Sequence, residues 1–238
     1  MSAEKPQLIV ALDVDTFEKA REVVDKLSPV VDIFKIGSQL FTSCGPAAAR
    51  FILARSKKVF LDLKYHDIPN TVASAVSAAT GLGETVGAGK QGIFMLTVHT
   101  QGGKAMMEAA VCAAKEKAQG LQIQKPLIVG ITALTSDEKT NSTQDVVLQR
   151  ALLAKESGLD GVVASVHEAK AIRQKLGGDF VIVTPGIRPS GADTGDQKRI
   201  ATPKEAALNG SNYLVVGRPI IESADPLETA KKILEEIS

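Results

Sequence analysis

Short apolar runs alternate with longer segments of helical spacing along the chain. Each run is almost continuously apolar and rich in Val, Ile, Leu or Phe, which is typical of parallel strands buried on both faces. These runs predict strands at residues 7–13, 31–37, 58–64, 93–100, 126–133, 161–165, 180–186 and 213–219. The segments between them repeat apolar residues every three or four positions, as amphipathic helices do. They predict helices at residues 16–27, 46–55, 69–82, 103–118, 144–156, 167–176, 203–208 and 226–237.

Local start signals support several of these helices. Thr16, Thr202 and Asp225 each precede a predicted helix and carry a side chain suited to capping its first backbone N–H groups. Pro203 and Pro226 follow two of these caps, in the first helical turn, where proline fits. Strict alternation also occurs in an open doubly wound sheet, but eight units of about thirty residues favour a closed barrel. We therefore predict an α/β fold, a single (β/α)8 TIM barrel domain over residues 1–238.

Composition and charge narrow the class of protein. The 238 residues are 44% hydrophobic and 23% charged, which is typical of a soluble globular protein with a large core. The net charge of +1 provides no long-range field to recruit nucleic acid or an anionic membrane, so neither partner is expected. Asp13 and Asp15 interrupt the first apolar run, which argues against a signal peptide or membrane span there. Two cysteines, Cys44 and Cys112, are too few for a disulfide framework and indicate a cytoplasmic protein.

Charged side chains gather near the carboxyl ends of the predicted strands, the end at which barrel enzymes keep their active sites. In the segment 61–64 the residues alternate, so Asp62 and Lys64 share one face and two leucines share the other. If the leucines pack on helices, the charges point into the barrel. A salt bridge that only closes the barrel is the alternative, but a buried ion pair stabilises a protein poorly. Lys35 and Asp67 lie in the same predicted neighbourhood, which favours a catalytic site. Other polar residues near strand ends are Asp13, Thr97, His99, Thr132 and Ser165.

The loops after the last two predicted strands indicate an anion site. Gly186 precedes Arg188 in the first loop, and Gly217 precedes Arg218 in the second. Glycine lets backbone N–H groups approach an oxyanion, and the planar arginine fork matches a phosphate. Barrels commonly bind phosphate with these two loops. The alternative is that both arginines are solvated loop charges.

Residues 60–71, FLDLKYHDIPNT, resemble the signature of the bacterial orotidine 5′-phosphate decarboxylase family. The D-x-K-x-x-D core is shared with a wider group of barrel enzymes, whereas the following IPNT is more particular to this family. The loop 81–92 is longer than usual in the family and is expected opposite the catalytic end. Further matches cover the length of the chain, at residues 11–13, 34–37, 98–99, 102–103, 134–136, 160–169, 184–189, 196–197 and 216–218.

The resemblance implies an enzyme that converts orotidine 5′-monophosphate to uridine 5′-monophosphate and CO2, the last step of de novo UMP biosynthesis, without a metal or cofactor. It implies that Lys64 protonates C6 as CO2 leaves, and that Asp62 lies beside the substrate carboxylate. Lys35 and Asp13 are implied to bind the ribose hydroxyls. The residues leave open whether Asp62 also destabilises the bound carboxylate.

The resemblance also implies a homodimer and a phosphate site. Asp67, the fourth member of the Lys-Asp-Lys-Asp tetrad, and Thr71 are implied to reach the site of the partner subunit. Thr135 is implied to contact the pyrimidine. The residues implied to bind the 5′-phosphate are Arg188, Gln197, Gly217 and Arg218, with Gln197 on a loop that closes over it.

Two other functions are compatible with this pattern. A Mg2+-dependent sugar-phosphate decarboxylase of the same barrel group, such as 3-keto-L-gulonate 6-phosphate decarboxylase, shares D-x-K-x-x-D. It has an acidic residue where Lys35 stands, and a lysine there opposes a divalent cation. A non-catalytic barrel that binds a nucleotide or sugar phosphate is the second alternative. Binding by itself does not require two lysines and two aspartates crowded together.

Overall fold

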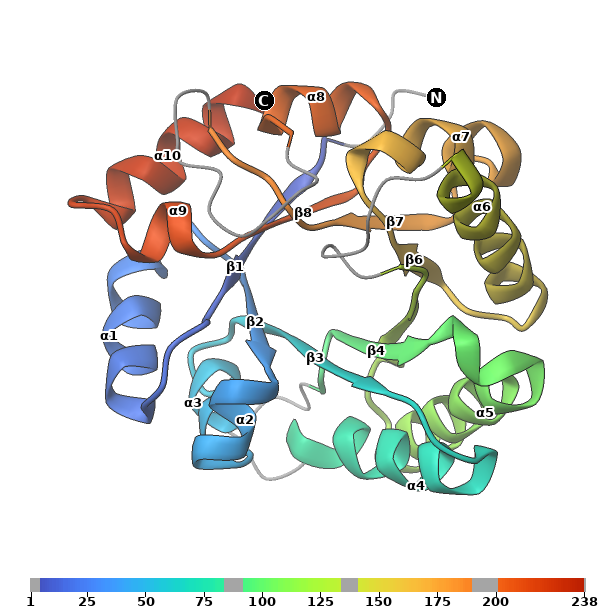
Figure 1. Cartoon of the computed structure of the whole chain (residues 1–238). Coiled ribbons are helices and arrows are strands. Elements are labelled where there is room, and N and C mark those ends of the chain that lie inside the picture. The colour runs from blue at the N-terminus through green and yellow to red at the C-terminus, as the bar shows by residue number, and fades with distance from the viewer. Residues whose placement is uncertain (1–4, 84–91, 134–140, 190–200, 238) are drawn as a thin grey trace.

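The chain folds into a closed barrel of eight parallel strands in sequence order, with β8 pairing back onto β1 (Figure 1). The structure is a computed structural model that describes residues 5–83, 92–133, 141–189 and 201–237. The strands are β1 (Gln7–Ala11), β2 (Ile33–Gly37), β3 (Lys58–Tyr65), β4 (Met95–His99), β5 (Leu127–Ile131), β6 (Gly161–Val163), β7 (Val181–Thr184) and β8 (Tyr213–Val216). The predicted (β/α)8 fold is confirmed.

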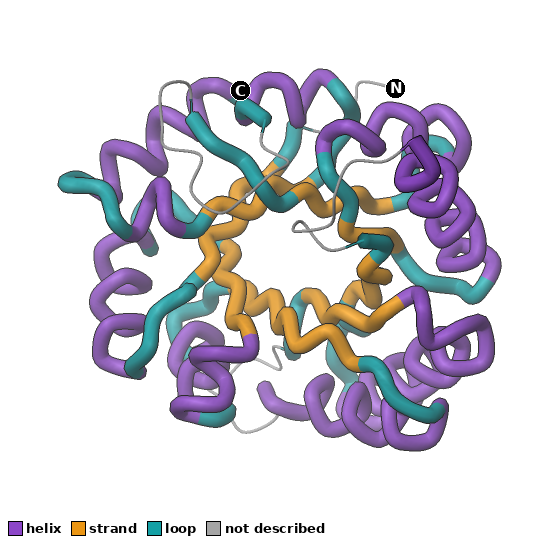
Figure 2. The backbone as a smooth tube through the Cα atoms, in the orientation of Figure 1, coloured by secondary structure: helices purple, strands orange, loops and turns teal. Residues whose placement is uncertain are grey.

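Helices form an outer ring around the strands (Figure 2). The α-helices are α1 (Phe17–Leu27), α2 (Ser38–Cys44), α3 (Ala47–Leu53), α4 (Pro69–Thr80), α5 (Gly103–Leu121), α6 (Asn141–Glu156), α7 (Val166–Leu176), α8 (Pro203–Leu208), α9 (Arg218–Ile221) and α10 (Pro226–Glu236). Two short 3-10 helices are η1 (Gly81–Gly83) and η2 (Thr100–Gly102). Within the described ranges, no helix is long and apolar enough to cross a membrane.

The hydrophobic core has two layers, separated by the strands. The larger layer lies between strands and helices and includes Val10, Phe34 and Leu61, each fully buried. The smaller layer, which includes Ile9 and Phe60, fills the inside of the barrel. Because successive strand residues point to opposite faces, Asp62 follows Phe60 into the barrel, while Leu61 packs outward. The prediction that the leucines face helices and the carboxylate faces inward is therefore confirmed at this position.

Local capping signals work as predicted. Thr16 precedes α1 and its side chain accepts a hydrogen bond from the backbone N–H of Lys19. Thr202 and Glu205 form a reciprocal capping box at the start of α8. The Asp225 side chain accepts the backbone N–H of Glu228 at the start of α10. A cap acts over three residues, so it can be predicted without knowledge of the fold.

The structure corrects two element predictions. The strand predicted to reach residue 219 ends at Val216, and Gly217 caps the short helix α9, in whose first turn Pro219 lies. Proline has no backbone N–H to give to a strand ladder, so it fits a helix start better. The helix α2 was not predicted, because its seven residues, of which only Leu40 is buried, are too few to show a helical period.

At the amino end of the strands, the Arg173 side chain joins α7 to the segments that precede β7 and β8. Its guanidinium group forms six hydrogen bonds of 2.6 to 3.1 Å. The acceptors are the carbonyl oxygens of Gly177, Gly178, Phe180 and Gly210, the last of which accepts twice, and the amide oxygen of Asn212. The Asn212 amide oxygen also accepts the backbone N–H of Ile182 in β7. These contacts make Arg173 a structural clamp, far from the carboxyl ends of the strands.

We expect Arg173→Ala to lower the free energy of unfolding by about 3 kcal/mol, since several carbonyl groups lose a charged donor. Arg173→Lys should lie between the wild type and the alanine variant, because an ammonium replaces only part of the planar fork. Urea denaturation followed by circular dichroism measures the difference. A loss within about 0.5 kcal/mol for Arg173→Ala, typical of a surface change, would contradict the clamp.

Candidate active site

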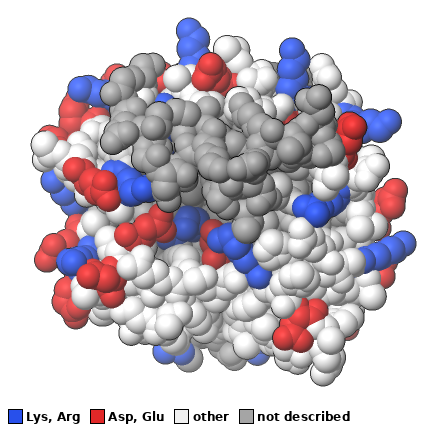
Figure 3. Space-filling model, in the orientation of Figure 1, with Lys and Arg blue, Asp and Glu red and all other residues white. Residues whose placement is uncertain are grey.

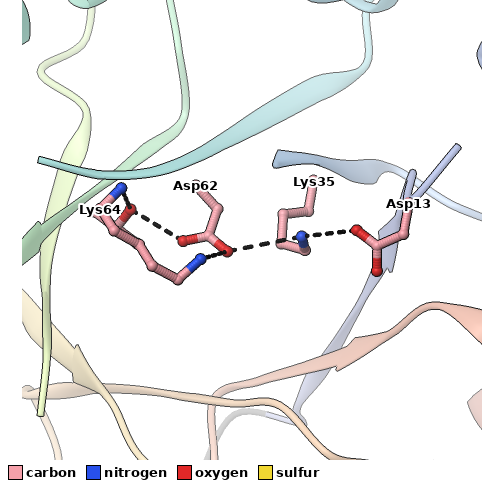
Figure 4. A network of polar contacts seen from close by, with 5 residues as sticks. Asp13, Lys35, Asp62 and Lys64 are labelled. Carbon is pink, nitrogen blue, oxygen red and sulfur yellow. Dashed lines mark hydrogen bonds and ion pairs between the residues drawn. The ribbon is translucent and has the colours of Figure 1, made fainter. Parts of the chain in front are cut away.

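Four charged side chains of alternating sign form a continuous network at the carboxyl ends of β1, β2 and β3 (Figure 4). Lys35 Nζ lies 3.2 Å from Asp13 Oδ1 and 3.7 Å from Asp62 Oδ2. Lys64 Nζ lies 2.9 Å from the same Oδ2 atom of Asp62. The side chains of Lys35 and Asp62 are each 11% exposed, whereas that of Lys64 is 37% exposed. The Lys64 ammonium is thus held at the mouth by a carboxylate that is almost buried.

The order of charges explains how this cluster is tolerated. Asp62 stands between two ammonium groups, and Lys35 stands between two carboxylates, so each interior charge has partners of opposite sign. Desolvation still makes such a network a poor device for stability. Four convergent charges at the catalytic end of a barrel indicate a site built for chemistry.

The backbone at Lys64 departs from a regular strand. Leu61 pairs with Leu96 and Tyr65 pairs with Val98, so β3 contains two more residues than β4 over this stretch. Lys64 adopts a left-handed conformation with φ of 52°, which costs an L-amino acid roughly 1–2 kcal/mol. Simple alternation therefore does not explain how the Lys64 ammonium reaches Asp62. An irregular backbone held by its surroundings is common at functional sites.

Thr97 of β4 fills the irregular gap beside Lys64. Its Oγ1 atom lies 2.8 Å from the backbone nitrogen of Lys64 and 3.0 Å from Asp62 Oδ1. From the sequence, Thr97 was one of several polar residues near strand ends, with no role attached. No sequence pattern distinguishes it, since its partners lie more than thirty residues away along the chain.

The network opens into a cavity of about 200 Å3 that also contains the arginines of the last two loops. Arg188 and Arg218 both line it, together with Gly186 and Gly217. Arg188 is 6% exposed, so it is not a solvated loop charge. A Cβ atom on Gly217 would lie 3.0 Å from Asp13 Oδ2, which is tight and explains why a glycine suits this position. The ammonium of Lys64 and two guanidinium groups therefore face one cavity.

The remaining candidate residues lie elsewhere. Asp67 and Thr71 are exposed, on the segment that leads into α4 and on its first turn. Asp67 Oδ1 accepts the backbone N–H of Ile68 at 2.7 Å, and neither residue lines the cavity. The structure of one chain does not bring Asp67 into the network. Thr135 and Gln197 lie outside the described residues.

Two titratable side chains beside Lys64 favour their neutral forms. Desolvation lowers the pKa of His99, and the nearby His66 and Lys64 charges lower it further. The rings of His99 and His66 lie 5.2 Å apart. Burial raises the pKa of the Tyr65 phenol.

Among the described residues around the site, charged side chains of both signs occur. On the face shown in Figure 3, basic and acidic residues are interspersed. In the part of the chain that the structure describes, no three His, Cys, Asp or Glu side chains gather as metal ligands would. Asp13 and Asp62 are instead bridged by the Lys35 ammonium. The arrangement can bind an anion near the arginines and deliver a proton from Lys64.

Several known proteins that are similar to this chain carry the same name. The family model described as orotidine 5′-phosphate decarboxylase / HUMPS family matches residues 6–233. A protein from Moorella thermoacetica named orotidine 5′-phosphate decarboxylase is 47% identical, with 98% of this chain and 92% of that protein covered. A protein of the same name from Saccharophagus degradans is 45% identical, with 100% of this chain and 98% of that protein covered.

Solved structures agree with these sequence matches. The crystal structure of orotidine 5′-phosphate decarboxylase from Lactobacillus acidophilus is similar with a TM-score of 0.82 and 35% identity, covering 99% of this chain and 100% of that one. The crystal structure of an uncharacterized conserved protein from Geobacillus kaustophilus gives a TM-score of 0.81 at 32% identity. It covers 97% of this chain and 100% of that one. Sequence, fold and the matched length thus lead to one assignment: the chain belongs to the orotidine 5′-phosphate decarboxylase / HUMPS family.

Proposed function

We propose that this chain is an orotidine 5′-phosphate decarboxylase, which converts orotidine 5′-monophosphate to uridine 5′-monophosphate and CO2. The observation that carries the proposal is the Lys64 ammonium, 2.9 Å from Asp62 and in one cavity with Arg188 and Arg218. The names of the full-length relatives support the same reaction. A proton donor and an anion site in one cavity are the two features that this substrate requires.

In the proposed mechanism, Lys64 supplies both charge and proton. The bond between C6 and the carboxylate breaks, CO2 leaves, and the electron pair stays on C6. The pyrimidine ring cannot delocalise this sp2 carbanion, so a fixed ammonium in a water-poor pocket must stabilise it. Lys64 Nζ then gives its proton to C6 and is reprotonated from solvent. Asp62 lies beside the substrate carboxylate and holds the ammonium in place.

The other proposed roles follow the same geometry. Asp13 and Lys35, 3.2 Å apart, bind the ribose hydroxyls. Arg188 and Arg218 bind the 5′-phosphate, and Gly217 lets its oxygens approach the backbone. We also propose that Gln197 completes the phosphate site and that Thr135 contacts the pyrimidine.

The Lys35 ammonium separates this function from that of a Mg2+-dependent sugar-phosphate decarboxylase. It lies within 4 Å of both Asp13 and Asp62, the carboxylates that a divalent cation would need. The deciding experiment incubates the purified protein with orotidine 5′-monophosphate in excess EDTA and follows the loss of orotate absorbance. We expect turnover with uridine 5′-monophosphate as product. No turnover with or without Mg2+ would reject the proposal, and so would EDTA-sensitive turnover.

We propose that the active form is a homodimer in which Asp67 and Thr71 contact the substrate of the partner subunit. Both residues are exposed, as is Ile68 between them at 67%, so this segment is accessible to a second subunit. In the proposed tetrad, Asp62 comes from the same chain as Lys64, and Asp67 of the partner subunit supplies the second carboxylate.

A mixing experiment tests the shared site. Lys64→Ala and Asp67→Ala homodimers should both be nearly inactive. In a mixed dimer, one site carries both defects and the other carries neither. Random reassociation should therefore restore about a quarter of the wild-type activity. Activity that stays at the level of the separate variants, although the dimers have exchanged subunits, would contradict a site shared across the interface.

We further propose that residues 1–238 form one domain that works in the cytoplasm. The closed barrel uses all eight strands, and the surrounding helices pack on it without a linker segment among the described elements. Cys44 and Cys112 are both free thiols. Reduced cysteines agree with a reducing compartment.

A further inference from the structure

We propose that Thr97 is a positioning residue for this reaction. Its hydroxyl group holds Lys64 in the left-handed backbone conformation and fixes the Asp62 carboxylate between the two lysines. The inference rests on the proposed function, because it assigns Thr97 to the delivery of the Lys64 ammonium. It adds a second layer to the site, formed by β4, which contributes no charge to the network.

The hydrogen-bond directions follow from the chemistry of the three groups. The Lys64 backbone N–H can only donate, so Thr97 Oγ1 accepts from it at 2.8 Å. An ionised carboxylate can only accept, so the hydroxyl proton goes to Asp62 Oδ1 at 3.0 Å. The other carboxylate oxygen, Oδ2, faces Lys64 Nζ and Lys35 Nζ. One hydroxyl thus fixes the rotation of Asp62, with one oxygen directed to β4 and the other to the lysines.

The backbone needs this hydroxyl because the strand pairing fails here. Regular pairing stops at Leu61 with Leu96 and resumes at Tyr65 with Val98. Thr97 stands opposite the extra residues, and its side chain takes the backbone N–H of Lys64 in place of a ladder carbonyl. A left-handed Lys64, with φ of 52°, persists only where its surroundings determine it. The same side chain that satisfies the backbone also orients the carboxylate that holds the ammonium.

Thr97 acts through other residues, without contacting the substrate. It is fully buried and is not among the residues that line the cavity. Without its hydroxyl, Lys64 N–H and Asp62 Oδ1 both lose a partner, and the ammonium can shift relative to the reacting carbon. A misplacement of about 1 Å can cost on the order of 10²-fold in rate. The phosphate site, formed by Arg188 after β7 and Arg218 at the start of α9, keeps its geometry.

The test compares Thr97→Val with Thr97→Ser. Valine matches threonine in shape and lacks the hydroxyl, whereas serine keeps the hydroxyl and loses a methyl group. We expect Thr97→Val to lower kcat by about 10²-fold, with KM for orotidine 5′-monophosphate and Kd for uridine 5′-monophosphate changed by less than about threefold. Thr97→Ser should keep kcat within about threefold of the wild type. Thermal unfolding of all three proteins checks that they are folded.

Three results would overturn the proposal: a kcat for Thr97→Val within about twofold of wild type, an equal loss for serine and valine, or a loss confined to KM. If Thr97→Val does not fold, Thr97→Ala takes its place, because it removes the hydroxyl without adding bulk, and the same three results apply. The proposed function is tested separately by the wild type. An inactive wild type rejects the function, whereas an active wild type with a fully active valine variant rejects only the role of Thr97.

Discussion

Lys64→Ala is expected to lower kcat by on the order of 10⁵-fold, because one substitution removes both the proton donor and the charge that stabilises the carbanion. The two effects act on the same atom, C6, so neither is replaced by another described side chain of the cavity. Water could supply a proton, but the fixed positive charge would still be missing. The loss is measured as kcat in the absorbance assay with saturating orotidine 5′-monophosphate.

The barrel should remain folded in this variant. Alanine, like lysine, has a Cβ atom, so the left-handed backbone at position 64 costs the same before and after the change. The Lys64 side chain is partly exposed, and Asp62 keeps Lys35 at 3.7 Å. Lys125→Ala is a matched control, since this lysine also pairs with an aspartate, Asp160, at 2.6 Å, but precedes β5 at the opposite end. Near-normal kcat for Lys64→Ala in a folded protein would remove the proposed mechanism.

Arg218→Ala is expected to lower kcat/KM for orotidine 5′-monophosphate by about 10²- to 10³-fold, the usual cost of removing one partner from a desolvated charge pair. The phosphate is remote from C6, but its binding energy can be used to complete the site and expel water. The sharpest measurement repeats the assay with orotidine, which lacks the phosphate, by following release of labelled CO2. With orotidine as the substrate, the variant and the wild type should have the same kcat/KM.

Arg55→Ala is the matched control for Arg218→Ala. Arg55 also carries a guanidinium and forms an ion pair, with Asp25 at 2.7 Å, but it precedes β3 at the other end of the barrel. Arg55→Ala should leave kcat/KM unchanged for both orotidine 5′-monophosphate and orotidine. An unchanged kcat/KM for Arg218→Ala with the phosphorylated substrate, or an equal loss with both substrates, would show that Arg218 does not bind the phosphate.

Much of the fold could be predicted because its signals are local. Continuous apolar runs indicate strands buried on both faces, and residues such as Thr16 and Thr202 set helix starts through contacts three residues away. The short helices α2 and α9 were missed, since segments of seven and four residues contain too little periodicity. In addition, the start of α9 directly follows the apolar run of β8, so its first residues were predicted as part of that strand.

Some site residues could be identified from the sequence, whereas the role of others depends on tertiary contacts. Motifs in the sequence identified Asp62, Lys64 and Arg218 as candidates, and the topology of a parallel barrel predicted that they share one end. Thr97 could not be identified, because its importance depends on the mismatch between β3 and β4 and on two hydrogen bonds to residues distant in the chain. The spacing also named Asp67, but its role across a subunit interface comes only from family resemblance, since in one chain it is exposed and bonded to Ile68.

By itself, the sequence determined that the chain alternates strands with helices and that its charges lie near strand ends, because both depend on contacts between near neighbours and on the period of each element. The tertiary structure decided how those charges meet. Lys35 lies between Asp13 and Asp62, Lys64 adopts a left-handed backbone, and both arginines turn into one cavity. These features depend on the register between strands distant in sequence, and closing the ring is what brings β1, β3 and β8 around one mouth.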